Sequence, residues 1–433
     1  MANAGTAPNS APSGRKPRVL TVLPDFPFPA NTGLHLRHAS LLELIHRLGC
    51  YSALLYFTTE EREPPSLGTT PLARICDEVC HGGRRFRHSD FSTASLVLHK
   101  AGFLLRGLLG LPGKRYPFSM SYDRIGAAAI VLAEARRVQA DFVVLPGFML
   151  HYAAELRANG FRVIADAIDV LSELSARLLA CYGNNLFSRL GLYSNHVACE
   201  AQERIYLPKC SEVWATSSQE AETLSRIAPD INVLVVPNCL DEFAFQPGHP
   251  ASNPTVGFIG TYSSFPNLQA ARFLAEMFPA VLREHPRARL KLAGAGLPSE
   301  EEKRFRSLGY VDILGAVAQS EDFYEQCCVV ALPVFVRGGV PLKLVESLAR
   351  EKPVVACSET VAGLDVRDGH DVLVREGVED FAQAVSLLLA DDSLRLRLAR
   401  NGRDTFMRNW SLSRAESTMQ LSSLLAQSQP GKN

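Results

Sequence analysis

Short apolar runs alternate with longer amphipathic stretches along most of this chain. Residues 18–23 read RVLTVL, and this length and content predict a buried strand. A loop rich in Pro, Gly and Asn follows. Leucine and isoleucine then recur at helical spacing over residues 34–48, which predicts an amphipathic helix with Asn31 or Thr32 as its N-cap. This alternation of strand and helix is typical of parallel α/β sheets.

The same pattern continues to the C-terminal region. Further strands are predicted at residues 52–57, 142–145, 163–165, 213–216, 233–236, 256–260, 288–294, 313–314, 329–333 and 353–357. Helices are predicted at residues 267–284, 321–327, 342–350, 381–390 and 394 to about 410, with one more in the last twenty residues. We expect an α/β fold with two doubly wound, Rossmann-like domains.

The clearest break in composition marks the expected domain boundary. Pro237-Asn238 and the stretch FQPGHPASNP at residues 245–254 are rich in Pro, Gly and Asn, as linkers are. We therefore predict a disordered tail at residues 1–16, a first domain at 17–245, a second at 255–408, and a C-terminal helix and tail at 409–433. A length of 433 residues also fits two domains better than one core.

Composition narrows the class of protein. The 45 basic and 45 acidic side chains cancel, whereas a nucleic-acid partner requires a basic face, so none is expected. The first residues lack the apolar core of a signal peptide, and no run of 18 apolar residues occurs. Ten scattered cysteines fit a cytoplasmic protein. Cys76, Cys80 and His81 are the nearest approach to a metal cluster, without a second pair, and no metal is expected.

The segment 337–346 (RGGVPLKLVE) carries the most distinctive chemistry. It follows an apolar strand, and Pro341 is placed to open a helix. Gly338 and Gly339 allow the backbone to approach a ligand, and the helix N-terminus offers free N–H groups. The cations Arg337 and Lys343 suit a diphosphate, and the carboxylate of Glu346 suits the hydroxyl groups of an attached ribose. The alternative is a plain connection, with Lys343 and Glu346 as a surface pair at i,i+3.

Taken together, the motifs resemble those of the retaining GT-B glycosyltransferases of family four, from about Arg18 to Trp410. The pieces that carry this resemblance occur in the family's order: residues 27–29 with Gly33 and Arg37, 215–220, 236–238, 256–260 with Asn267, 292–294 with Gly296, 315–317, 337–346 and 352–356.

The resemblance implies a GT-B fold with the active site in the cleft between its two domains. The first domain would lie on the acceptor side, and the second would bind the nucleotide sugar. The implied reaction moves a sugar, as hexosyltransferases do, from a UDP- or GDP-type donor to a hydroxyl-bearing acceptor. The acceptor would be a glycan, a lipid-linked compound or a small molecule. Anomeric configuration would be retained without a metal or other cofactor.

Roles for individual residues also follow from the resemblance. Arg337 and Lys343 would neutralise the diphosphate as catalytic cations, and Glu346 would accept hydrogen bonds from the ribose hydroxyls. The donor would further contact Gly260, Gly315, Val317, Gly338 and Gly339, with residues 315–317 beside the base. The transferred sugar or the acceptor would contact Gly33, His35, Arg37 and His151.

Two departures from the family pattern leave other functions open. Gly338 stands where many members have an acidic residue, and the loop at residues 261–267 lacks the family's usual cations. One alternative is therefore a nucleotide-sugar epimerase or hydrolase of the same architecture. Another is a donor-binding partner subunit without turnover.

Two further segments bear on the acceptor and on location. Residues 96–111 are apolar with interspersed cations, which fits either a core helix of the first domain or contact with an anionic membrane surface. We expect a core helix first, with peripheral contact at the inner membrane face as the alternative. Residues 186–193 are candidates for an acceptor groove.

Overall fold

The computed structural model describes residues 15–30, 32–58, 70–84, 98, 101–102, 105, 125–181, 186–247 and 253–425. Its internal contacts divide the chain into two units. Unit 1 comprises Met1–Phe26, Leu41–Val236 and Glu416–Asn433, and unit 2 comprises Pro27–Ser40 and Pro237–Ala415. The division after Val236 coincides with Pro237-Asn238 and precedes the stretch 245–254. The first loop, with the start of the first helix, belongs to unit 2.

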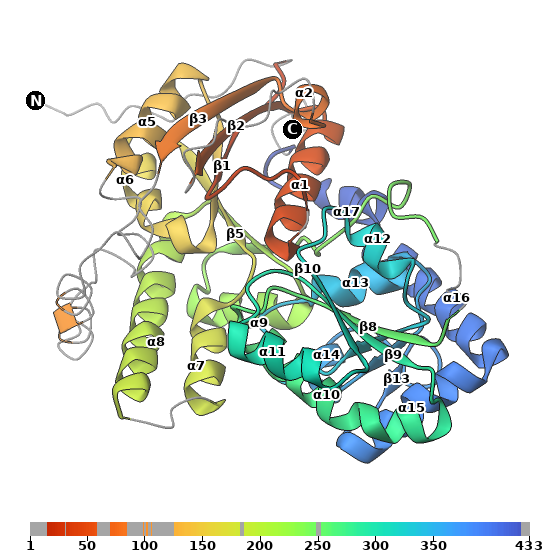
Figure 1. The fold of residues 1–433 in the computed structure, drawn as a ribbon. Helices are drawn as coiled ribbons and strands as arrows, with labels where there is room; N and C mark the ends of the chain where they lie inside the picture. Colours follow the sequence, from red (N-terminus) through yellow and green to blue (C-terminus); the bar gives the residue numbers. More distant parts are fainter. Residues whose placement is uncertain are drawn as a thin grey trace, which may run out of the picture. The chain divides into compact units, whose positions relative to one another are not determined.

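Unit 1 is built on a seven-stranded parallel sheet with strand order β3-β2-β1-β4-β5-β6-β7 (Figure 1). Its strands are β1 (Arg18–Leu23), β2 (Tyr51–Thr58), β3 (Glu78–Arg84), β4 (Phe142–Pro146), β5 (Arg162–Ala167), β6 (Glu212–Ala215) and β7 (Asn232–Val235). Strands β1, β2 and β4 are buried nearly throughout, as expected for a parallel sheet covered on both faces. Edge strand β3 is half exposed and contains His81 and two glycines, so its sequence lacks the apolar run that predicted the others.

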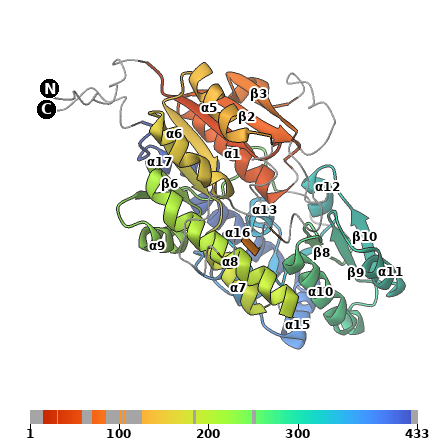
Figure 2. The ribbon, with the colours of Figure 1, turned by 90° about the vertical axis from the view of Figure 1, so that its left-hand side faces the viewer.

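Helices of unit 1 cover this sheet. They are α2 (Leu72–Ile75), α5 (Ala127–Arg137), η4 (Gly147–Tyr152), α6 (Ala153–Ala158), α7 (Leu171–Cys181), α8 (Leu186–Tyr206), η5 (Leu207–Lys209) and α9 (Ser218–Ile227). Helices α7 and α8 lie side by side (Figures 1 and 2). Two helices are shared between the units: α1 (Gly33–Arg47) and α17 (Leu412–Met419). At the start of α9, Ser217 accepts a hydrogen bond from the Glu220 amide at 3.3 Å, as a capping residue does.

Unit 2 is built on a six-stranded parallel sheet with strand order β10-β9-β8-β11-β12-β13. Its strands are β8 (Thr255–Ile259), β9 (Arg289–Ala293), β10 (Val311–Gly315), β11 (Val329–Leu332), β12 (Val354–Ala356) and β13 (Leu373–Val374). The strand order reverses at β8, where β9 lies on one side and β11 on the other. Ligands of such sheets bind outside the carboxyl ends of the strands at this reversal.

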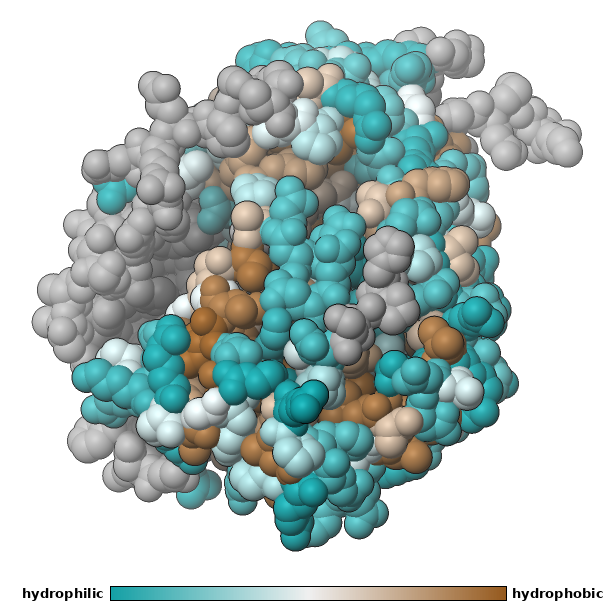
Figure 3. All heavy atoms as spheres, turned by 45° about the vertical axis from the view of Figure 1, so that its right-hand side comes forward, coloured by the Kyte–Doolittle hydropathy of each residue, from teal (hydrophilic) through white to brown (hydrophobic). Residues whose placement is uncertain are grey.

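Helices of unit 2 bury an extensive apolar core against the sheet. They are α10 (Phe265–Glu284), α11 (Ser299–Ser307), α12 (Ser320–Tyr324), α13 (Leu342–Ala349), α14 (Ser358–Val361), α15 (Val378–Ala390) and α16 (Asp392–Asn409). Helix α13 is buried over most of its length because Leu344, Val345 and Leu348 face the core. On the molecular face drawn in Figure 3, hydrophilic residues dominate, with hydrophobic patches among them, as is normal for a globular surface.

The α/β fold class is confirmed in both units, and each predicted strand has a counterpart within a few residues. The segment 96–111 lies largely outside the described residues. Its described leucines, Leu98 and Leu105, are 73% and 59% exposed, so the expected core helix is wrong at these two positions. Among the described residues, no helix has both the length and the apolar character needed to cross a membrane.

Candidate functional site

A cavity of about 290 Å³ opens at the carboxyl edge of the unit 2 sheet. It adjoins the ends of β8, β9 and β10 and the beginning of α13, which follows β11. This is the reversal in strand order at which a doubly wound sheet binds its ligand. The lining residues are Thr32, Gly33, Ile259, Gly260, Thr261, Asn267, Gly294, Ala295, Ala316, Val317, Ser320, Leu342, Lys343 and Glu346.

Glycines let the strand ends approach one another at the base of this cavity. A Cβ added to Gly294 would lie 2.0 Å from the carbonyl oxygen of Gly260, so no other residue fits there without movement. The amide of Gly294 donates to the carbonyl of Gly315 at 2.7 Å, and Gly315 has a left-handed φ of 67°. At Gly260 and Gly294 the chain therefore presents backbone to the cavity.

Two helices begin at the cavity, both with residues that belong to unit 2. Helix α1 starts at Gly33, and the hydroxyl of Thr32 accepts a hydrogen bond from the His35 amide at 3.2 Å, which makes Thr32 the N-cap. A Cβ added to Gly33 would lie 3.5 Å from a methyl group of Leu342, the first residue of α13. Helix N-termini carry partial positive charge, so this wall of the cavity favours an anion.

A short segment at residues 237–239 holds both helix starts. Arg37, in the second turn of α1, donates from Nη1 to the carbonyl of Pro237 at 2.8 Å. Asn238 donates from Nδ2 to the carbonyl of Val340, just before α13, at 3.1 Å. The expected sugar contact Arg37 is 1% exposed and outside the cavity lining that the structure describes. Its hydrogen bond fixes the start of α1.

Lys343 supplies the cation of the cavity. Its Nζ donates to the Oδ1 atom of Asn267 and lies 4.6 Å from the ring centroid of Phe258. Burial lowers the pKa of Lys343 from its usual value near 10.5 to about 8, and Glu346 partly offsets this. The ammonium is therefore mostly charged at neutral pH and partly desolvated, which strengthens its attraction for an anion.

Glu346 lies one turn along α13 from Lys343 and is 6% exposed. Its Oε1 accepts a hydrogen bond from the Ser320 hydroxyl at 2.7 Å. Burial raises the pKa of Glu346, while Ser320, Arg350 and Lys343 act in the opposite direction. The carboxylate is oriented from one side and borders the cavity, where it can accept hydrogen bonds from hydroxyl groups.

The second expected cation, Arg337, has a different environment. It is 8% exposed and outside the described cavity lining. Its guanidinium donates to the backbone carbonyls of Glu359 at 2.6 Å, of Gly339 at 3.0 Å and of Ala362. These bonds join the loop before α13 to helix α14. The geometry supports a structural role in this loop.

The other predicted site residues divide between the cavity and its surroundings. Gly33, Gly260 and Val317 line the cavity with Lys343 and Glu346. Gly315, Gly338, Gly339 and His35 lie outside this lining. His151 belongs to unit 1, at the end of η4, where its ring centroid is 3.9 Å from that of Tyr152.

The sequence pattern assigns no role to Asn267 or Ser320, although both line the cavity with polar side chains. Both lie at the beginnings of helices that follow strands of the unit 2 sheet, α10 and α12. A search for polar residues in the first turns of helices at the carboxyl edge could have found them.

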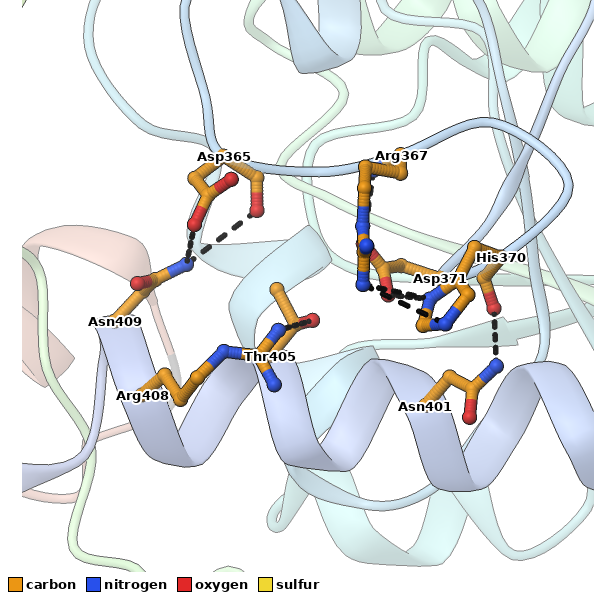
Figure 4. A network of polar contacts seen from close by, with 8 residues as sticks. All are labelled: Asp365, Arg367, His370, Asp371, Asn401, Thr405, Arg408 and Asn409. Carbon is orange, nitrogen blue, oxygen red and sulfur yellow. Dashed lines mark hydrogen bonds and ion pairs between the residues drawn. The ribbon is translucent and has the colours of Figure 1, made fainter.

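A second polar network of unit 2 lies outside the cavity lining (Figure 4). Buried Asp371 accepts hydrogen bonds from the amide of Arg367 at 2.8 Å and from His370 at 2.6 Å. Asn401 on α16 donates to the carbonyl of His370 at 2.9 Å. These bonds fasten the loop before β13 to α16. Burial raises the pKa of Asp371, but hydrogen bonds from His370, Arg367 and Thr405 outweigh it and lower that pKa below its usual value.

Comparison with known proteins agrees with the geometry of unit 2. Residues 253–391 match the family model described as glycosyl transferases group 1. A stretch of 108 residues is 31% identical to the N,N'-diacetylbacillosaminyl-diphospho-undecaprenol alpha-1,3-N-acetylgalactosaminyltransferase of Campylobacter jejuni. That match covers 24% of this chain and 28% of the relative.

Solved structures resemble nearly the whole chain. Sucrose-phosphate synthase from Thermosynechococcus elongatus has a TM-score of 0.66 at 17% identity, covering 94% of this chain and 97% of that one. HepE of Anabaena, in complex with UDP and glucose, has a TM-score of 0.61 at 14% identity, covering 92% and 97%. At these identities the likeness establishes the GT-B fold, and the family match in unit 2 supports a glycosyltransferase of group 1.

Proposed function

We propose that this protein transfers a sugar from a UDP- or GDP-type nucleotide sugar to a hydroxyl-bearing acceptor. The transfer retains the anomeric configuration and needs no metal. The observation that carries this proposal is the cavity of unit 2, where Lys343, Glu346 and two helix N-termini meet at the carboxyl edge of the sheet. A nucleoside diphosphate combines an anion with vicinal hydroxyl groups, and this cavity offers a partner to each.

The diphosphate binds between the starts of α1 and α13, beside the ammonium of Lys343. When the bond from the sugar to the diphosphate oxygen breaks, negative charge grows on the leaving oxygen atoms. Fixed positive charge at that position stabilises the transition state more than the ground state and so raises the rate. This is the work that a divalent ion performs in metal-dependent transferases.

The nucleoside occupies the opposite end of the cavity. Glu346 accepts hydrogen bonds from the ribose hydroxyls, and the Ser320 hydroxyl holds its carboxylate in place. The base lies along the backbone of Ala316 and Val317, which present peptide groups rather than charged side chains. We assign the carboxylate to the ribose because an anion facing the diphosphate would repel it.

The compared proteins support this substrate class. The bacterial relative is named for transfer of N-acetylgalactosamine to a lipid-linked saccharide, and HepE was solved with UDP. By analogy we propose a hexosyl donor and, as acceptor, a glycan, a lipid-linked compound or a small molecule. We further propose a cytoplasmic location, with peripheral contact at the inner membrane face if the acceptor is lipid-linked.

The test measures release of nucleoside diphosphate from purified full-length protein, with UDP- and GDP-sugars, in the presence and absence of acceptor mixtures. Acceptor-dependent release with a product of unchanged anomeric configuration is the expected result. Equal turnover with donor alone would favour an epimerase or hydrolase. Tight binding of UDP or GDP without any turnover would favour a donor-binding subunit. Absence of binding to both nucleotides would overturn the proposal.

A further inference from the structure

The ammonium of Lys343 is held by a side chain from a different helix. Asn267, in the first turn of α10, accepts the hydrogen bond of Lys343 through Oδ1. The amide group of Asn267 is itself fixed, because its Nδ2 atom donates to the carbonyl of Thr261 at 2.9 Å. With Nδ2 committed to that carbonyl, the amide oxygen must face Lys343.

Gly260 leaves the space in which this amide group lies. A Cβ added to Gly260 would be 2.8 Å from Cγ of Asn267 and 3.0 Å from Oδ1. Those atoms form the end of a flexible side chain, so a larger residue at position 260 would displace the Asn267 amide. Gly260, which follows β8, thus leaves room for the Asn267 amide and also borders the cavity.

Among the described residues, no neighbour of Lys343 other than Asn267 accepts a hydrogen bond from Nζ. Phe258 of β8 offers a ring face at 4.6 Å, an attraction with little directional demand. The hydroxyls of Tyr324 on α12 and Ser347 on α13 donate to the backbone carbonyl of Lys343, at 3.3 and 2.6 Å. The charged group that acts on Lys343 is Glu346 on the same helix. The hydrogen bond to Asn267 therefore sets the direction of the Lys343 ammonium.

We propose that Asn267 is the positioning residue for Lys343, and that Gly260 is required because it admits the Asn267 amide. This inference rests on the proposed function, since it assigns a role within the same nucleotide site. A neutral acceptor orients the cation without cancelling its charge, whereas a carboxylate at this position would compete with the diphosphate. The requirement is specific for an amide at position 267.

The experiment follows the dissociation constant of UDP and GDP by calorimetry from pH 6.5 to 9.5. The free ammonium of Lys343 should dominate this profile, because its pKa is lowered to about 8. Asn267→Asp places a carboxylate against Lys343, which should move the midpoint upward by about one pH unit or more. The same variant should weaken binding at pH 7 by about tenfold, because it adds a negative charge beside the diphosphate.

Asn267→Ala should move the midpoint of the pH profile downward. Burial then lowers the pKa of Lys343 without the opposing hydrogen bond to Asn267, which favours the charged ammonium. Binding at pH 7 should weaken by about three- to tenfold, the usual value of one hydrogen bond. Gly260→Ala should reproduce the Asn267→Ala profile although it removes no polar group, because its methyl group displaces the Asn267 amide from Lys343. A merely structural role for Asn267 would not shift the midpoint in opposite directions in its two variants.

Two matched controls separate these effects from general damage. Asn401→Ala removes one surface hydrogen bond of α16 (Figure 4), and Gly191→Ala adds a methyl group where no atom lies within 4 Å. Both should bind nucleotide with the wild-type profile. Unchanged midpoints in both Asn267 variants, with binding lost in Lys343→Ala, would overturn the positioning role and leave the proposed function standing. Failure of the wild-type protein to bind either nucleotide would overturn the proposed function itself.

Discussion

Arg337 and Lys343 lie six residues apart, and their cationic groups have different partners. The Arg337 guanidinium donates to three backbone carbonyls, of Gly339 in its own loop, of Glu359 in α14 and of Ala362 just after α14. The Lys343 ammonium faces the cavity and is held by a single side-chain amide. A planar fork with five donors suits the bridging of several carbonyls, whereas an ammonium is a compact charge on a flexible stem.

This difference shows how one segment can supply both a scaffold and a binding group. Arg337 stabilises the loop from which α13 starts, and Lys343 uses the position that the loop provides. If the assignment is right, the two cations should fail in different ways when removed. Loss of Lys343 should impair chemistry in a stable protein, and loss of Arg337 should reduce stability first.

The largest effect is expected for Lys343→Ala. Turnover of the donor sugar should fall by about two orders of magnitude or more, because the developing charge on the diphosphate loses its fixed cation. The melting temperature should stay near that of the wild type, since burial makes the ammonium costly for the fold. Lys303→Ala, an exposed lysine on α11, is the control. Activity of Lys343→Ala close to that of the wild type would contradict the diphosphate assignment.

Arg337→Ala should lower the free energy of unfolding by about 2–4 kcal/mol, because carbonyls bonded to a buried cation lose their donors. Chemical denaturation measures this value, with Arg306→Ala as the control. Arg306 belongs to an exposed i,i+4 pair with Glu302 at 2.7 Å, and its loss should cost less than about 0.5 kcal/mol. If the Arg337→Ala variant were fully stable but inactive, Arg337 would be assigned to diphosphate binding instead of to the stability of its loop.

Much of the architecture could be predicted from hydrophobic patterning, because the strands of a parallel sheet are buried on both faces. Strand β1, with its sequence RVLTVL, is an example. The pattern did not reveal β3, which contains His81 and two glycines at a half-exposed edge. It also missed α11, whose sequence SEEEKRFRS buries Phe305 alone. Elements that bury little apolar surface leave a weak periodic signal.

The part of the site that lies on a regular element could be predicted from sequence, and the part that lies in loops or on distant elements could not. Lys343 and Glu346 lie on one face of a helix, so their spacing alone brings them to the same cavity edge. Arg337 lies in a loop, where spacing does not determine the direction of a side chain. Asn267 is 76 residues from Lys343 in sequence, and Ser320 is 26 residues from Glu346. Only the topology of the sheet brings each pair into contact, so the spacing in sequence does not predict these contacts.

The pH dependence of binding sharpens the comparison further. A guanidinium group keeps its charge over the whole range in which proteins stay folded, whereas burial lowers the pKa of the Lys343 ammonium to about 8. Affinity for UDP or GDP should therefore be nearly constant below pH 7 and fall as pH rises through 8, approaching about tenfold per pH unit. Isothermal titration calorimetry across this range measures the effect. Constant affinity up to pH 10 would mean that Lys343 does not contact the diphosphate.

The smallest effect is expected from removal of divalent ions. If Lys343 and the two helix N-termini carry the charge of the diphosphate, excess EDTA should change donor turnover by less than about twofold. The assay compares untreated protein, EDTA-treated protein, and EDTA-treated protein with added magnesium or manganese. Loss of activity that either ion restores would contradict a metal-independent site. It would also change the comparison between the two cations, because Lys343 would then share the leaving-group charge with a metal ion and Lys343→Ala would retain much of its activity.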